Sequence, residues 1–207
     1  MTSVLKAPVR RTQSDRRQQS ESELLRAAAA LIAEQGTAAA TFENIGARAG
    51  YSRGLVTQRF GSKQGLIEAL IARLQARIQG LLDDRQLDAL NGLEAILAFV
   101  DIFLRNLAED GELRAYFVLM AGAVAEVSDL RGPFAAAHKE VEIRLEGLVL
   151  RGQAEGVIRE GLDADAAALI VGSLLLGLST QLLVDPALNL EPIRETSLAT
   201  LRASFGV

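Results

Sequence analysis

The segment GYSRGLVTQRFGSK, residues 50–63, has the form of one short helix between two turns. Ser52 is a residue type that favours helix N-caps, because its hydroxyl can accept a hydrogen bond from a backbone amide of the first turn. Gly50 and Gly61 stand where a preceding and a following helix would end, since glycine adopts the left-handed conformation of a helix terminus at little cost. We therefore predict a helix over residues 53–60.

A second short helix precedes this one, with Thr41 as its N-cap and residues 42–49 as its body. At about 100° per residue, Val56 and Phe60 share one face of the later helix and would pack back on Ile45. Two short helices joined by a glycine turn are typical of a helix-turn-helix, whose second helix enters the major groove of DNA.

The distribution of charge supports contact with nucleic acid. Residues 1–63 contain ten Lys/Arg and five Asp/Glu, whereas residues 64–207 contain twelve and twenty-one, within a formal net charge of −4. Residues 44–67 hold four cations and no acid. Duplex DNA carries a negative charge about every 1.7 Å along its axis, so a carboxylate on the docking face would be repelled. We interpret the acid-free stretch as the surface that faces phosphate.

The rest of the chain predicts helices and no sheet, because apolar residues recur at intervals of three and four throughout. Residues 1–19 read as a basic arm that is unstructured alone. The first helix is expected to begin at Ser20, with Glu23 completing a capping box. We expect about nine helices in an all-α fold, the later ones near residues 63–84, 88–108, 112–127, 134–155, 163–184 and 191–204.

Composition excludes several classes of site. The chain has no cysteine and one histidine, so neither a thiolate metal site nor a disulfide is expected. Catalytic and phosphate-loop motifs are missing from the sequence, which predicts no enzyme, no cofactor and no metal. The longest apolar run, residues 166–178, is shorter than a membrane span, and the start of the chain lacks an apolar signal region. We expect a cytoplasmic protein with no membrane partner.

The segment TFENIGARAGYSRGLVTQRFGSKQGLIEAL, with AAAALIAEQGTAAAT before it, resembles the DNA-binding motif of the TetR family of bacterial transcriptional regulators over about residues 20–70. The matching positions are Thr41, Ile45, Ala49, Gly50, Ser52, Gly54, Phe60, Ser62, Lys63 and Leu66. This resemblance implies a basic arm (1–19), a helix-turn-helix domain (20–66) and an effector-binding and dimerisation domain (67–207). It also implies a dimeric regulator, expected to be a repressor, that binds a palindromic double-stranded DNA operator and is released by a small apolar or amphipathic effector.

Specific roles follow for the predicted DNA-binding surface. Arg53 is placed to read guanine and Gln58 to read adenine, while Arg59 and Lys63 are placed to contact phosphate. Family members usually carry Tyr where this chain has Thr57 and often His where it has Arg59, so those contacts differ here. The full predicted set is Thr41, Asn44, Tyr51, Ser52, Arg53, Gly54, Leu55, Thr57, Gln58, Arg59 and Lys63.

Aromatic residues gather in the middle third of the chain, as they would around an apolar ligand or in an ordinary core. The candidate ligand-binding residues are Phe99, Phe103, Tyr116, Phe117, Met120, Phe134 and His138. The last two helices are apolar enough to pair with their copies, and the candidate dimer-interface residues are Ala167, Gly172, Leu175, Leu178, Leu198 and Leu201. Two alternatives stay open at this point: a helical ligand carrier or enzyme with a vestigial DNA-binding fold, and a constitutive DNA-binding protein without an effector.

Overall fold

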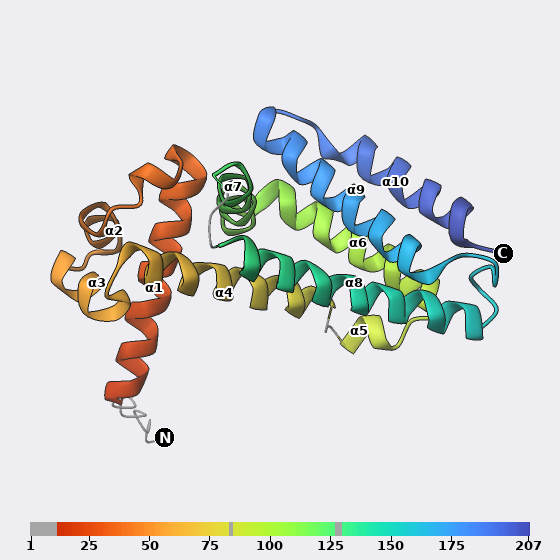
Figure 1. Cartoon of the computed structure of the whole chain (residues 1–207), viewed down its shortest axis with the longest axis horizontal. Coiled ribbons are helices and arrows are strands. Elements are labelled where there is room, and N and C mark those ends of the chain that lie inside the picture. The colour runs from red at the N-terminus through yellow and green to blue at the C-terminus, as the bar shows by residue number, and fades with distance from the viewer. Residues whose placement is uncertain (1–11, 83–84, 127–129) are drawn as a thin grey trace, which may run out of the picture.

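A computed structural model describes residues 12–82, 85–126 and 130–207, and these are helical almost throughout (Figure 1). The elements are α1 (Gln13–Gln35), α2 (Phe42–Ala49), α3 (Arg53–Phe60), α4 (Lys63–Leu82), α5 (Arg85–Asp88), α6 (Gly92–Glu109), α7 (Gly111–Ala125), α8 (Arg131–Ala154), α9 (Ala164–Val184) and α10 (Leu190–Phe205). A single 3-10 turn, Thr37–Ala39, lies between α1 and α2. The all-α prediction is confirmed. The one-turn helix α5 was not predicted.

Helices α1, α2 and α3 form a small unit at one end of the molecule, and α4 leads from it into the larger body (Figure 1). The predicted bounds of α2 and α3 are confirmed, because their signals are local. The hydroxyl of Thr41 accepts from the Asn44 amide at 3.1 Å, and that of Ser52 accepts from the Leu55 amide at 3.2 Å. Gly50 adopts a left-handed φ of 75°, which lets α2 end and the chain turn into α3.

The start of α1 differs from the prediction. The helix begins one residue after Thr12, whose side chain and that of Asp15 form the capping box that the sequence had suggested at Ser20. Ser20 lies inside the helix instead, and its hydroxyl donates to the Arg17 carbonyl oxygen at 2.9 Å. The expected basic arm is therefore helical over residues 13–19, and its residues 1–11 lie outside the described part of the chain.

The body is built from α5 to α10. Helices α6, α8, α9 and α10 run lengthwise beside one another, whereas α7 crosses them and α5 is a single turn (Figure 1). The first turn of α6 touches α8 closely, because a Cβ on Gly92 would lie 2.3 Å from the Gly152 nitrogen. Helix α10 is tied to α6 by two arginines. Arg194 pairs with Asp101, and Arg202 forms a two-pronged ion pair with Glu94 at 2.5 and 3.0 Å.

Helix α9 corrects part of the predicted dimer interface. Ala167 and Leu175 are buried within the chain's own core, so these side chains are unavailable to a partner. Leu201 of α10 is largely buried but lines the groove between α9 and α10, so it stays a candidate. Gly172 lines a cavity described below. Leu178 and Leu198 are half-buried and stay candidates.

Helix α9 also has the length and apolarity of a membrane span, with 21 residues and a mean hydropathy of 2.0 over an 18-residue window, whereas the sequence had suggested only a 13-residue run. It packs along α8 and also contacts α6 and α7. Its outward face keeps apolar side chains in contact with solvent, such as that of Ile170, which is 56% exposed. An exposed apolar strip of this kind is typical of a surface that binds a partner.

Substitution of Gly92 tests the close approach of α6 and α8. We expect Gly92→Ala to lower the free energy of unfolding by about 1–3 kcal/mol, because the new methyl group would overlap backbone atoms that cannot move aside. Gly147→Ala on α8 is the matched control: its methyl would meet nothing within 4 Å, so we expect a gain of about 0.5–1 kcal/mol. Denaturant midpoints measure both, and equal midpoints for wild type and Gly92→Ala would contradict the packing.

Candidate functional site

Two candidate sites lie at opposite ends of α4, and the first is the exposed side of α3. Val56 is buried against the small core, as predicted, while Arg53, Thr57 and Gln58 are exposed. Within the described residues, Arg53 and Lys63 have no carboxylate partner. Both cations are therefore available to an external anion.

Several predicted DNA-contacting residues already serve the local structure. The hydroxyls of Thr41 and Ser52 cap α2 and α3. The Asn44 amide donates to the Ala39 carbonyl oxygen at 3.0 Å, and the Thr57 hydroxyl donates to the Arg53 carbonyl oxygen at 3.1 Å. These groups hold the backbone of the motif, although their exposure leaves room for a second contact. Of the other two residues in the predicted set, Gly54 is exposed and Leu55 is half-buried.

Tyr51 and Arg59 turn inward and attach the motif to α1. The Tyr51 hydroxyl donates to the Glu23 carboxylate, and that hydrogen bond raises the pKa of the phenol. The Arg59 guanidinium donates to the Ser20 hydroxyl at 3.2 Å. Both side chains are half-buried, so the structure favours a role in positioning α3 over the predicted phosphate contact of Arg59. No local sequence signal marks these partners, which lie 28 and 39 residues away.

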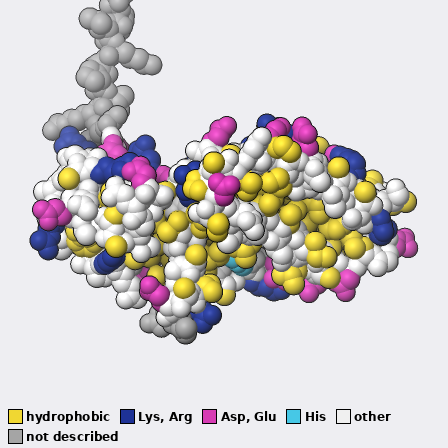
Figure 2. Space-filling model, turned by 90° about the horizontal axis from the view of Figure 1, so that it is seen from above, with side chains coloured by type: hydrophobic (Ala, Val, Ile, Leu, Met, Phe, Trp, Pro, Cys, Tyr) yellow, Lys and Arg dark blue, Asp and Glu magenta, His cyan; other side chains and the backbone are white. Residues whose placement is uncertain are grey.

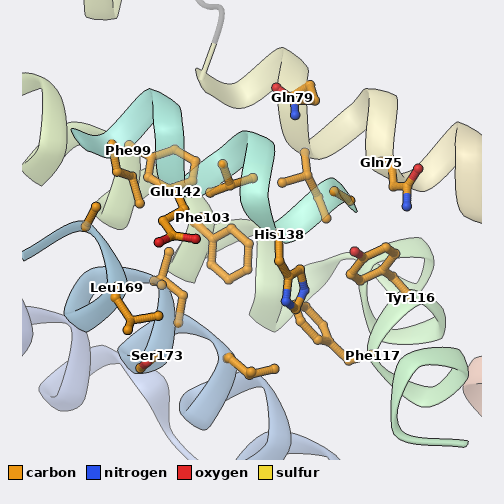
Figure 3. Close-up of a pocket in the computed structure, with 18 residues that line it drawn as sticks. Gln75, Gln79, Phe99, Phe103, Tyr116, Phe117, His138, Glu142, Leu169 and Ser173 are labelled. Carbon is orange, nitrogen blue, oxygen red and sulfur yellow. The ribbon is translucent and has the colours of Figure 1, made fainter. Parts of the chain in front are cut away.

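The second site is a cavity of about 140 Å³ between α4, α6, α7, α8 and α9 (Figure 3). Five of the seven predicted ligand-binding residues line it: Phe99, Phe103, Tyr116, Phe117 and His138. Met120 and Phe134 are buried but do not line it. The Phe134 ring instead packs edge-on against Tyr116, with centroids 5.1 Å apart. Sequence analysis missed the polar lining residues, which are Gln75, Gln79, Glu142 and Ser173.

The rings of the cavity hold one another in fixed orientations. Phe103 and Phe117 meet edge-on at 6.2 Å, and Tyr116 and Phe117 do so at 5.3 Å. Burial raises the pKa of Tyr116 to about 12. His138 lies at the mouth, where it is partly exposed, and the surrounding protein lowers the pKa of its imidazole. The phenol and the imidazole are therefore both uncharged at neutral pH.

Helix α4 connects the two sites. Its last turns contribute Gln75 and Gln79, whose side-chain amides donate to the Pro133 carbonyl oxygen at 3.0 Å and to the Glu140 carboxylate at 2.8 Å on α8. In the middle of α4, the Arg73 guanidinium contacts the Ser22 hydroxyl of α1 at 3.1 Å and the Glu112 carboxylate of α7 at 3.2 Å. One arginine thus joins the small unit, α4 and the body.

No cluster of three or more potential metal ligands occurs among residues 12–82, 85–126 and 130–207.

In comparisons with known proteins, a family model matches the small unit, and solved structures match the whole fold. Residues 24–70 match the family model described as bacterial regulatory proteins, tetR family. SmeT of Stenotrophomonas maltophilia, the repressor of the multidrug efflux pump SmeDEF, is 27% identical, with 90% of each chain covered and a TM-score of 0.73. Its triclosan complex gives a TM-score of 0.77 at 27% identity, covering 91% of this chain and 92% of that one.

Two solved structures of lower identity share the fold. A TetR transcriptional regulator from Chloroflexus aurantiacus is 20% identical, with a TM-score of 0.79 and coverage of 93% and 98%. The fatty acid degradation regulator FadR of Bacillus halodurans is 20% identical, with a TM-score of 0.77 and coverage of 94% and 97%. No curated protein matches the chain.

Titration of the two tyrosines tests the geometry of both sites, because Tyr51 and Tyr116 are the only tyrosines of the chain. Their pKa values are raised above the usual 10.0 in the folded state. We expect less tyrosinate absorbance near pH 10 from the folded protein than from the unfolded one. The stabilisation from Tyr116 should be complete below pH 10 and lost as the pH rises towards 12.

Tyr116→Phe separates the two signals, since it leaves only Tyr51. A folded wild-type protein in which one phenol ionises at its ordinary pKa would contradict the burial of Tyr116 or the hydrogen bond of Tyr51.

Proposed function

We propose that this chain, which carries a TetR-family N-terminal domain on a TetR-like fold, is a dimeric, ligand-responsive repressor that binds a palindromic operator through α3. The observation that carries the proposal is the pair of exposed cations without a carboxylate partner among the described residues, Arg53 on α3 and Lys63 at the start of α4, on a chain whose residues 64–207 are acidic. The functional boundary between the DNA-binding and effector domains falls within α4, because α4 belongs to both. The DNA-binding unit then begins at α1, at residue 13, and includes part of the segment expected to be an arm.

Specific residues of α3 supply the contacts to DNA. Arg53 occupies the first turn, the part of a recognition helix that meets base edges, and its guanidinium matches the two acceptors of guanine. Gln58, five residues further along α3, is also exposed and can pair with adenine. Lys63, at the start of α4, is placed to contact phosphate and so to fix the register of the helix.

The dimer forms through the outward faces of α9 and α10. A shallow apolar groove runs between them, lined by residues that include Ile170, Leu174, Pro192 and Ile193. Figure 2, which views the molecule from the side of these helices, shows hydrophobic side chains across the body and charged ones mainly at its edges. Pairing with a second copy would cover this strip in a four-helix bundle and place two α3 helices on one operator.

The effector acts through α4. A ligand in the cavity would touch Gln75, Ile78 and Gln79. All three lie within about two turns of Arg73 on the same helix. An effector that prefers one placement of α4 shifts the population towards it, and the two α3 helices then move out of register with the operator. SmeT, a protein of similar fold, forms a complex with triclosan, which supports a small-molecule effector for this chain.

Replacement of Arg53 tests the role of α3. We expect Arg53→Ala to weaken binding to the operator by about 1–3 kcal/mol and to relax the preference at one base position, since a two-pronged contact is lost. Arg131→Ala, which removes an exposed cation from the body, is the control of equal charge. Electrophoretic shifts at one salt concentration measure both. Unchanged operator affinity for a folded Arg53→Ala protein would remove Arg53 from the interface.

Charge placed on α9 tests the dimer. We expect Ile170→Asp to yield a 22.1 kDa monomer that binds a palindromic operator weakly, because the α3 helix of one protomer makes half of the contacts. Ile143→Asp on α8 is the matched control, since both isoleucines are 56% exposed and only Ile170 lies in the α9–α10 groove. Light scattering gives the mass. If Ile170→Asp remained dimeric, the interface would have to lie elsewhere.

A further inference from the structure

The wall of the cavity is mostly apolar but carries one negative charge. Its lining contains one charged side chain, the carboxylate of Glu142 on α8, and no lysine or arginine. Figure 3 shows this carboxylate directed between Phe103 and Leu169, towards the space that the rings enclose. The side chain of Glu142 is only 22% exposed, so its charge is partly withdrawn from water. A charge in such a place is stable only with a partner.

The partner of Glu142 within the chain is easily displaced. The Lys139 ammonium lies 3.1 Å from the carboxylate, but its side chain is 56% exposed, and Asp165 attracts the same ammonium from 3.8 Å. Lys139 is not part of the cavity wall. It can therefore swing into solvent while the carboxylate stays, and His138 at the mouth adds no competing charge because its pKa is lowered.

The volume of the cavity limits the size of a ligand. About 140 Å³ is close to the ~150 Å³ of an engineered apolar cavity that binds benzene. One six-membered ring therefore fills it. Phe99 and Phe103 stand 6.0 Å apart and tilted at 54°, and Phe117 adds a third ring edge-on. Aromatic faces carry negative charge density, so this wall favours an aromatic ring and tolerates a nearby cation.

We infer that the cavity binds a single-ring aromatic amine, with the ring among Phe99, Phe103 and Phe117 and the ammonium on the Glu142 carboxylate. This inference rests on the effector half of the proposed function and narrows its ligand to a chemical class. A ligand ammonium would replace Lys139 as the partner of Glu142 and form a hydrogen bond between charged groups. A carboxylate ligand of the same size would meet Glu142 with like charge and would be rejected.

Three probes of similar size separate charge from shape: 2-phenylethylamine, 2-phenylethanol and phenylacetate. Calorimetric titration of the full chain at neutral pH should rank the amine above the alcohol by about tenfold in Kd, with no binding of phenylacetate. A two-ring amine should fail to bind because the cavity has no room for it. Equal or tighter binding of phenylacetate, or no binding of any single-ring probe, would overturn the inference.

Two variants assign the preference to Glu142. Glu142→Gln keeps the shape of the side chain and should bring the amine to the affinity of the alcohol, while the affinity for the alcohol stays the same. Glu146→Gln is the matched control, because Glu146 is a half-buried acid one turn further along α8 and outside the cavity wall. An amine preference that survives Glu142→Gln, or that Glu146→Gln abolishes equally, would sink the assignment.

Lys139→Gln adds a test whose expected result is a gain of affinity, which loss of folding cannot produce. Removing the competing ammonium should tighten binding of the amine and leave that of the alcohol unchanged, since only the amine competes for Glu142. Weaker binding of the amine to Lys139→Gln would contradict the displacement of Lys139. These measurements use no DNA, so a negative result would contradict the ligand class without bearing on DNA binding through Arg53. A negative result for Arg53→Ala would likewise leave the ligand class unaffected.

Discussion

The structure depends on one continuous helix that serves two cores. Helix α4 runs for 20 residues, about 30 Å, and buries Leu66 and Leu70 towards the small unit and Leu74 and Ile78 towards the body. Its first turn is capped by Ser62, whose hydroxyl accepts from the Gly65 amide at 3.1 Å. Because α4 contacts both the cavity and the small unit, it is an element through which the proposed effector could act on α3.

The polar side chains of the small unit divide into two groups with opposite orientations. Tyr51 and Arg59 point inward to α1, and Arg48 joins them by a two-pronged ion pair with Glu34 at 2.6 and 2.7 Å. These bonds fix α2 and α3 on α1, whose run of small alanines allows close packing. Arg53 and Lys63 point outward. A rigid support behind exposed cations suits the proposed binding of DNA, because it lowers the cost of ordering the side chains that would contact it.

The body shows how an apolar core can hold a cavity without losing its packing. Phe134 does not line the cavity but packs edge-on against Tyr116, so it supports this ring of the cavity wall. Helix α10 is fixed to α6 by the ion pairs of Arg194 and Arg202, which leaves the outer face of α9 uncovered by its own chain. The cavity and the apolar strip therefore use different faces of the same helix, and Gly172 and Leu175 belong to the cavity side.

The sequence by itself determined the elements whose signals are local. The caps at Thr41 and Ser52, with a glycine after each helix, predicted the bounds of α2 and α3 to the residue. Glycine and proline residues between the later helices predicted their bounds to within a few residues. The start of α1 was misplaced because Ser20 and Thr12 both carry a capping pattern, and only the structure shows which one is used. Tertiary structure alone decided the rest. Helix α9 is apolar all round, so no periodicity could choose its buried side. Only the folded chain shows that Tyr51 and Arg59 bond to α1, because such contacts depend on how helices meet and not on spacing along one helix. It alone also shows that Glu142 is mostly buried while Lys139 is exposed.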